Sequence, residues 1–174
     1  MQFWTNQDYQ LGYVQENLEF FMYSLFSFLV PFLIGRPQWL IGIIVNSSLI
    51  LAGLNLRDYK MLPIIFLPSI AVVARGIIFG PFTVFSFYII PAIWIGNAVL
   101  VFCFKSFRNR WISLGLGALL KTSILFGSAY ILVKFSVLPT IFLITLGILQ
   151  LYTAVAGGLL AFGVHSLKKK LNSR

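Results

Sequence analysis

Six long apolar runs constrain this chain more than any other feature of its sequence. They cover about residues 18–35, 39–56, 62–79, 84–104, 111–134 and 138–164. Each has about the 17–25 residues with which an α-helix crosses a bilayer. Lipid admits only helices or closed barrels, and these runs lack the alternation of barrel strands. The sequence therefore predicts an all-α membrane protein, a bundle of six transmembrane helices.

The composition supports a membrane as the solvent. Hydrophobic residues make up 59% of the 174 positions and charged residues only 10%, whereas soluble domains carry about a quarter charged residues. Three segments follow from this pattern. Residues 1–17 are polar and aromatic, which suits either a segment at the membrane surface or a loosely ordered tail. Residues 18–165 form the predicted six-helix domain, and residues 166–174 form a basic tail.

The basic residues predict the orientation. Nine of them fall on the side of the two termini: Arg57, Lys60, Lys105, Arg108, Arg110, Lys168, Lys169, Lys170 and Arg174. The other side has Arg36, Lys134 and, near its border, Arg75. Cytoplasmic loops carry the excess of Lys and Arg, so both termini are expected in the cytoplasm of a multi-pass protein of the cell (inner or plasma) membrane. Because the charges lie at span ends, they indicate topology and not a nucleic-acid partner.

Charged residues inside the predicted spans suggest a binding site. No Asp or Glu lies well inside a span, which disfavours a proton or sodium relay. Arg75 and Lys121 then lack an obvious counter-ion, and a buried cation without a partner is costly. We therefore expect them to face a polar cavity that accepts an anionic or carbonyl-rich small molecule. The alternatives are that Arg75 reaches the outer headgroups, or that Lys121 pairs with a carbonyl at a helix interface.

Amide side chains form a second group of mid-span polar residues. Asn97 and Gln150 are candidate ligand contacts, although such residues, Asn46 among them, also join neighbouring helices. The sequence shows no paired carboxylates, no nucleophile with a His–acid partner, no metal-spaced cluster and no phosphate-binding glycine loop. We expect a protein that is not an enzyme, binds no metal or cofactor and does not hydrolyse ATP itself.

One stretch carries a resemblance to a known family. Residues 75–105, RGIIFGPFTVFSFYIIPAIWIGNAVLVFCFK, join an Arg-Gly and Gly-Pro connection to a proline-containing span. This arrangement resembles the substrate-binding S component of energy-coupling-factor transporters. The resemblance implies that a transmembrane scaffold and separate ATPase subunits supply the energy, and that the bundle binds a vitamin or related micronutrient toward the outer face. On the family's pattern, Arg75 and Tyr88 would lie near the ligand.

Two other classes of protein fit the same features. One is a non-transport membrane scaffold resembling the rod-shape protein MreD, which would use the polar groups for helix packing and the basic rim for partners. The other is a small membrane enzyme that acts on lipid, for which the sequence offers no catalytic group. A binding subunit predicts a saturable small-molecule ligand, whereas a scaffold predicts a stable partner complex without one.

Overall fold

A computed structural model describes residues 12–34, 36–76 and 83–172, and within these ranges it is helical and contains no strand. The helices are α1 (Tyr13–Leu33), α2 (Gln38–Asn55), the short 3-10 helix η1 (Asp58–Lys60), α3 (Met61–Arg75), α4 (Thr83–Ser106), α5 (Arg110–Lys134), α6 (Ile141–Leu146) and α7 (Ile148–Asn172). The prediction of an all-helical protein is confirmed.

Within the described ranges, four stretches are long and apolar enough to cross a membrane: Gln38–Asn55, Phe87–Ser106, Arg110–Lys134 and Ile141–Leu171. Helix α3 is apolar but shorter, and α1 carries Glu16 and Glu19 in its first two turns. These apolar helices indicate a membrane-embedded protein.

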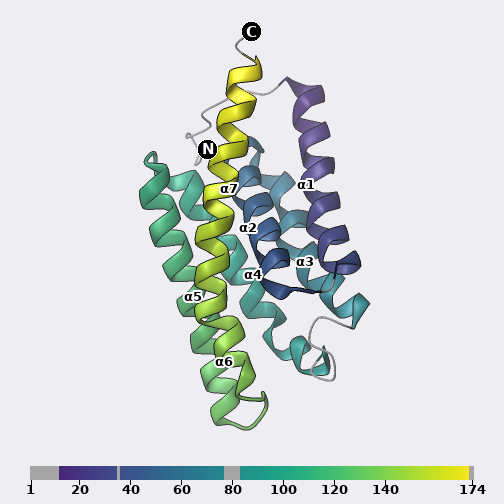
Figure 1. The fold of residues 1–174 in the computed structure, drawn as a ribbon, viewed down its shortest axis with the longest axis vertical. Helices are drawn as coiled ribbons and strands as arrows, with labels where there is room; N and C mark the ends of the chain where they lie inside the picture. The colour runs from purple at the N-terminus through teal and green to yellow at the C-terminus, as the bar shows by residue number, and fades with distance from the viewer. Residues whose placement is uncertain (1–11, 35, 77–82, 173–174) are drawn as a thin grey trace.

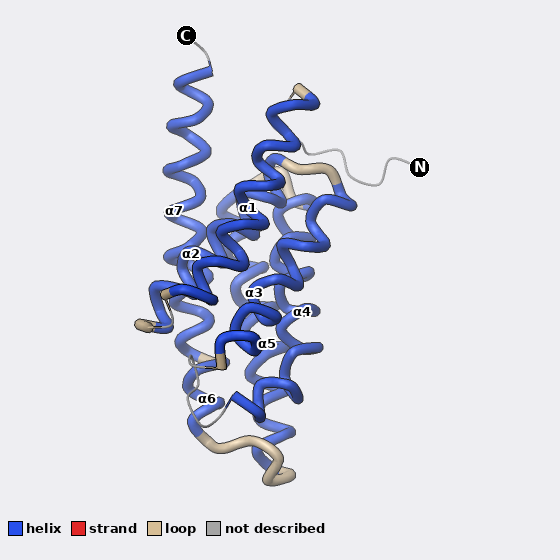
Figure 2. The backbone as a smooth tube through the Cα atoms, turned by 90° about the vertical axis from the view of Figure 1, so that its right-hand side faces the viewer, coloured by secondary structure: helices blue, strands red, loops and turns tan. Residues whose placement is uncertain are grey.

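Helix α2 forms the centre of the bundle. It packs against α1, α3, α4 and α7, and α5 lies against α4 and α7. Its second half is buried on every side, with Leu49, Ile50 and Leu54 in the main apolar core. Figure 1 shows α7 along the front of the bundle, with α5 on one side and α1 on the other. Helix α1 begins, and α7 ends, at the same end of the molecule (Figures 1 and 2).

Glycines allow α7 to approach α2 closely. A Cβ atom on Gly157 would lie 2.7 Å from the Ile43 carbonyl oxygen and 2.8 Å from the Asn46 Cβ. A Cβ on Gly42 would lie 2.9 Å from the Thr153 side chain. Small residues at a helix–helix contact are the usual means of close packing between apolar helices. The consequence is that Asn46 and Thr153 come within hydrogen-bonding distance.

Two helix boundaries differ from the prediction. The run over 138–164 is not one helix, because the chain turns at Gly147 (φ −98°, ψ −106°), where a Cβ would lie 2.5 Å from the Leu143 carbonyl oxygen. The run over 62–79 ends as a helix at Arg75, because Gly76 adopts the left-handed conformation (φ 68°) that terminates helices. Residues 77–79 of that run lie outside the described residues.

The two predicted terminal segments are also partly helical. Helix α1 begins at Tyr13, inside the segment 1–17, whose residues 1–11 lie outside the described part of the chain. Helix α7 continues to Asn172, so most of the basic tail 166–174 extends this helix. Residues 13–17 and 166–172 thus add helical turns to α1 and α7.

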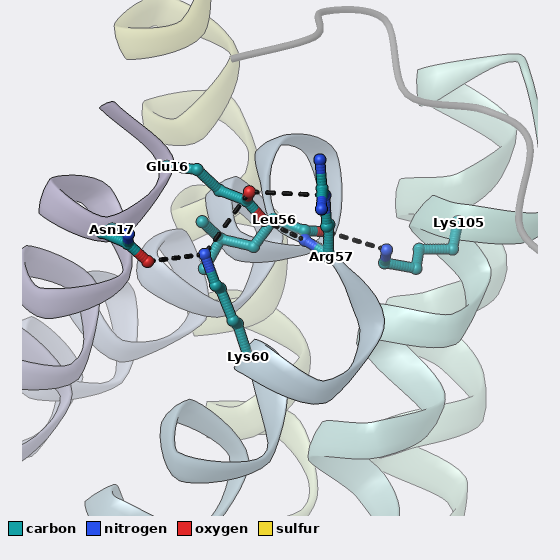
Figure 3. A network of polar contacts seen from close by, with 6 residues as sticks. All are labelled: Glu16, Asn17, Leu56, Arg57, Lys60 and Lys105. Carbon is teal, nitrogen blue, oxygen red and sulfur yellow. Dashed lines mark hydrogen bonds and ion pairs between the residues drawn. The ribbon is translucent and has the colours of Figure 1, made fainter. Parts of the chain in front are cut away.

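Glu16 of α1 organises a polar network at the end where α1 begins (Figure 3). Its carboxylate is buried, accepts a hydrogen bond from the Arg57 backbone N–H (3.0 Å) and forms ion pairs with Arg57 and Lys60 (both 3.4 Å). Lys60 Nζ also donates to Asn17 Oδ1 at 2.7 Å, and Lys105 Nζ donates to the Leu56 carbonyl oxygen at 2.8 Å. The network joins α1 and α4 to the connection between α2 and α3.

Glu19 forms the second part of this polar end. It accepts hydrogen bonds from Tyr23 and Asn55, both at 3.0 Å, and pairs with Lys168 of α7. Several basic residues that the sequence assigned to topology thus also have internal partners. Together the two glutamates fasten α1 to α2, to the α2–α3 connection and to α7.

Candidate functional site

A partly open cavity of about 100 Å³ lies among the helices, with side chains from α1 through α7 in its wall. The polar residues that line it are Gln38, Asn46, Ser69, Asn97, Lys121, Gln150 and Thr153. The rest of the wall is apolar and includes Ile41, Val45, Ile90, Ile93 and Leu149. A mostly apolar cavity with a few convergent polar groups is the usual form of a small-molecule site.

Lys121 of α5 supplies the positive charge of this cavity. Its side chain is 3% exposed, and Nζ donates to Asn46 Oδ1 at 2.5 Å and to Asn97 Oδ1 at 2.7 Å. Gly96 of α4 makes room for the lysine stem, since a Cβ there would lie 3.2 Å from Lys121 Cγ. Three helices, α2, α4 and α5, therefore meet at one amine.

Both asparagines are held so that their oxygens face the lysine. Asn46 Nδ2 donates to Thr153 Oγ1 at 3.2 Å, and the Thr153 hydroxyl donates to the Gln150 carbonyl oxygen, also at 3.2 Å. Asn97 Nδ2 donates to the Ile65 carbonyl oxygen at 3.1 Å. Each amide thus uses its NH₂ group to anchor itself and leaves its oxygen as an acceptor.

The charge of Lys121 has no acidic partner within the described part of the chain. The ion pairs there belong to Glu16 and Glu19, at the end of the bundle where α1 begins, and no Asp or Glu lines the cavity. A lysine ammonium has three donors, of which the two asparagines take two. Burying a cation without a counter-charge is costly. The site is therefore suited to bind an anionic or carbonyl-bearing group.

The structure brings three of the five predicted site residues together. Asn97, Lys121 and Gln150 all line the cavity. Tyr88 does not, because Ile90, Ile93 and Asn97 form the cavity-facing stripe of α4 and Tyr88, 59% exposed, lies on another face.

Arg75 also lies outside the cavity wall. Its guanidinium donates to the Phe32 carbonyl oxygen in the last turn of α1. Carbonyl groups in the last turn of a helix lack partners within that helix, so a basic side chain is a suitable donor to them. Arg75 therefore does not share the Lys121 cavity, and a role for it near a ligand stays a prediction.

Four polar residues of the wall were not among the predicted site residues. Asn46 stood out as a mid-span amide, whereas Gln38, Ser69 and Thr153 carried no signal of their own. One clue to these residues is helical spacing, because residues three or four positions apart share a helix face. If Asn46 faces a cavity, the same face of the helix also carries Val45, Gly42 and Gln38.

Comparisons with protein-family models, with curated proteins and with solved structures give no match for this chain. Among the described residues, no group of three or more His, Cys, Asp or Glu is placed to hold a metal ion. The cavity and the buried Lys121 are therefore the features that bear on function.

Proposed function

We propose that this chain is the membrane-embedded substrate-binding subunit of a micronutrient (vitamin-type) uptake transporter, similar to an S component and energised by separate ATPase subunits. The observation that carries the proposal is the buried Lys121 amine. Two amide oxygens hold it at a cavity that no acidic residue of the described ranges lines. An anionic group of the substrate supplies the missing counter-charge.

The position of the cavity along the helices supports entry of the substrate from the outer face. Its wall runs from Asn46 and Asn97, in the middle of their helices, to Gln38 at the start of α2. In the proposed six-span topology with both termini in the cytoplasm, the start of α2 is on the outer side. A substrate would then enter from outside and reach Lys121 at mid-depth.

The proposed orientation predicts which engineered cysteines an external reagent reaches. Thr140→Cys, exposed between α5 and α6, should react with a membrane-impermeant maleimide in intact cells. Ser166→Cys, exposed near the end of α7, should react only after the membrane is permeabilised. The native Cys103 is 2% exposed, so background labelling should be low. If Ser166→Cys is labelled in intact cells and Thr140→Cys is not, the orientation is the opposite of the one proposed.

The energising partners are tested by purifying the tagged full chain from its own membrane in mild detergent. Mass spectrometry of the copurifying proteins should identify a transmembrane scaffold and ATPase subunits. Recovery of cell-wall or cytoskeletal proteins in their place would contradict the transport role, and recovery of no protein would contradict a stable complex with ATPases.

A scaffold resembling MreD is the second candidate. The observation that favours it is that Lys121 bonds to Asn46 and Asn97 and so joins three helices, which is a structural role in itself. In that case no small molecule should bind saturably at the cavity.

A further inference from the structure

We infer that the substrate is a small monocarboxylate with an apolar middle and an uncharged hydrogen-bonding group at its far end. This inference rests on the proposed binding function and specifies the chemistry of the ligand. Three features of the cavity support this inference. They are the single charge of Lys121, a pair of glutamine amides at a second depth in the cavity, and the narrow, mostly apolar wall between Lys121 and the glutamines.

The deep end of the cavity holds one positive charge. Lys121 retains one N–H donor after its bonds to Asn46 and Asn97, and among the described residues no other charged side chain lines the wall. A phosphate monoester carries about −1.5 to −2 charges at neutral pH, more than one lysine balances. A cationic group would be repelled by the lysine. One carboxylate therefore matches the site best.

Gln38 and Gln150 form the second polar level. Both line the cavity and are half-buried, and within the described residues neither side chain has a hydrogen-bond partner. Gln38 precedes Asn46 by eight positions in α2, which is about 12 Å along the helix axis. Gln150 lies about one turn before Thr153, and Thr153 packs against Gly42, which is one turn after Gln38, so the two glutamines lie at similar depth. Each amide offers two donors and one acceptor without net charge. They suit a hydroxyl or amide group of the ligand.

The wall between the two levels is mostly apolar and narrow. The hydroxyls of Ser69 and Thr153 also line the cavity, but both donate to backbone carbonyl oxygens. Ile41 and Val45 of α2 face this space together with Ile90, Ile93 and Leu149, and no aromatic side chain in the described part of the chain lines it. The volume of about 100 Å³ is smaller than the roughly 150 Å³ of an engineered protein cavity that binds benzene. The enclosed part of the ligand is therefore slender, and an unbranched aliphatic segment fits better than a ring.

A matched series of five-carbon compounds tests the inference on the purified full chain. The measurement is the rise in thermal unfolding midpoint with ligand concentration, since a ligand of the folded state stabilises it. We expect 5-hydroxypentanoate to bind tightest. The neutral 5-hydroxypentanamide should bind about tenfold to a hundredfold more weakly, and pentanoate, which lacks the far hydroxyl, about fivefold more weakly. Glutarate and 5-aminopentanoate, charged at both ends, should also bind more weakly than 5-hydroxypentanoate.

A double variant separates the two polar levels. Gln38→Leu with Gln150→Leu should remove the preference for 5-hydroxypentanoate over pentanoate and keep the preference for acid over amide. Gln15→Leu, at an exposed position on α1, is the matched control and should change neither preference.

The outcomes distinguish the ligand class from the binding function. If the amide or 5-aminopentanoate binds as tightly as 5-hydroxypentanoate, the ligand class is wrong and the binding function stands. If the double variant keeps the hydroxyl preference, the assignment of the glutamines is wrong. If no member of the series binds, the ligand class is overturned, and the binding function is then decided by whether any small molecule copurifies with the chain.

Discussion

Replacing Lys121 with methionine is expected to weaken binding of 5-hydroxypentanoate by about tenfold to a hundredfold. A hydrogen bond to a charged group contributes about 1.5–3 kcal/mol, and each 1.4 kcal/mol is a factor of ten in affinity. Methionine keeps an unbranched side chain and so preserves most of the cavity shape. The measurement is the concentration dependence of the ligand-induced rise in thermal midpoint.

The matched control for this variant is Lys134→Met, at the exposed end of the same helix. It removes one positive charge from α5 without touching the cavity, so binding should not change. Without ligand, the thermal midpoint of Lys121→Met should shift little, because two effects oppose each other. The variant loses the hydrogen bonds to Asn46 and Asn97, which destabilises the fold, but it no longer buries a charge, which stabilises it. Equal binding by both variants would show that Lys121 only joins helices.

Glu16→Ala is expected to have the largest effect on stability. Breaking a buried ion pair costs about 3–5 kcal/mol, because the remaining charge stays buried without its partner. The Lys60 side chain is 6% exposed and would keep its bond to Asn17 and its contacts with the Tyr13 and Tyr59 rings, but no negative partner. The Arg57 backbone N–H would lose its acceptor. For a chain of this size, about 3 kcal/mol lowers the thermal midpoint by about 6–12 °C, which circular dichroism of the purified protein measures.

Arg57→Gln provides the comparison within the same network. The Arg57 side chain is 62% exposed, and an ion pair in that position contributes about 0–1 kcal/mol. Its midpoint should therefore fall by a few degrees at most. If Glu16→Ala and Arg57→Gln lower the midpoint equally, the buried pair between Glu16 and Lys60 does not stabilise the bundle.

The helical character of the chain could be predicted from its apolar runs, but the helix ends could not. At the turn the Leu143 carbonyl oxygen lies 2.5 Å from where a Cβ of residue 147 would be, so this backbone accommodates only Gly147. In the sequence, an isolated glycine in an apolar run does not indicate that the helix is interrupted there. The role of Glu16 was equally hidden, because its partners, Arg57 and Lys60, lie about 40 positions away and meet it only in the folded bundle.

The charged residue of the candidate site could be predicted from the sequence, but the set of residues that line the cavity could not. Lys121 stood out because a lysine in the middle of an apolar run is costly to bury and must have a partner or a polar cavity. Arg75 stood out for the same reason, yet it donates to a helix end at Phe32. Which buried cation faces a cavity depends on how the helices pack, and the sequence of one helix does not contain that information.

The central claim is that the cavity at Lys121 holds a small anionic molecule. The most direct test is mass spectrometry of the small molecules released from the full chain after purification from its own membrane, compared with Lys121→Met purified in the same way. We predict an anionic small molecule that accompanies the unchanged chain and is lost from the variant. The same set of small molecules from both proteins would contradict the claim.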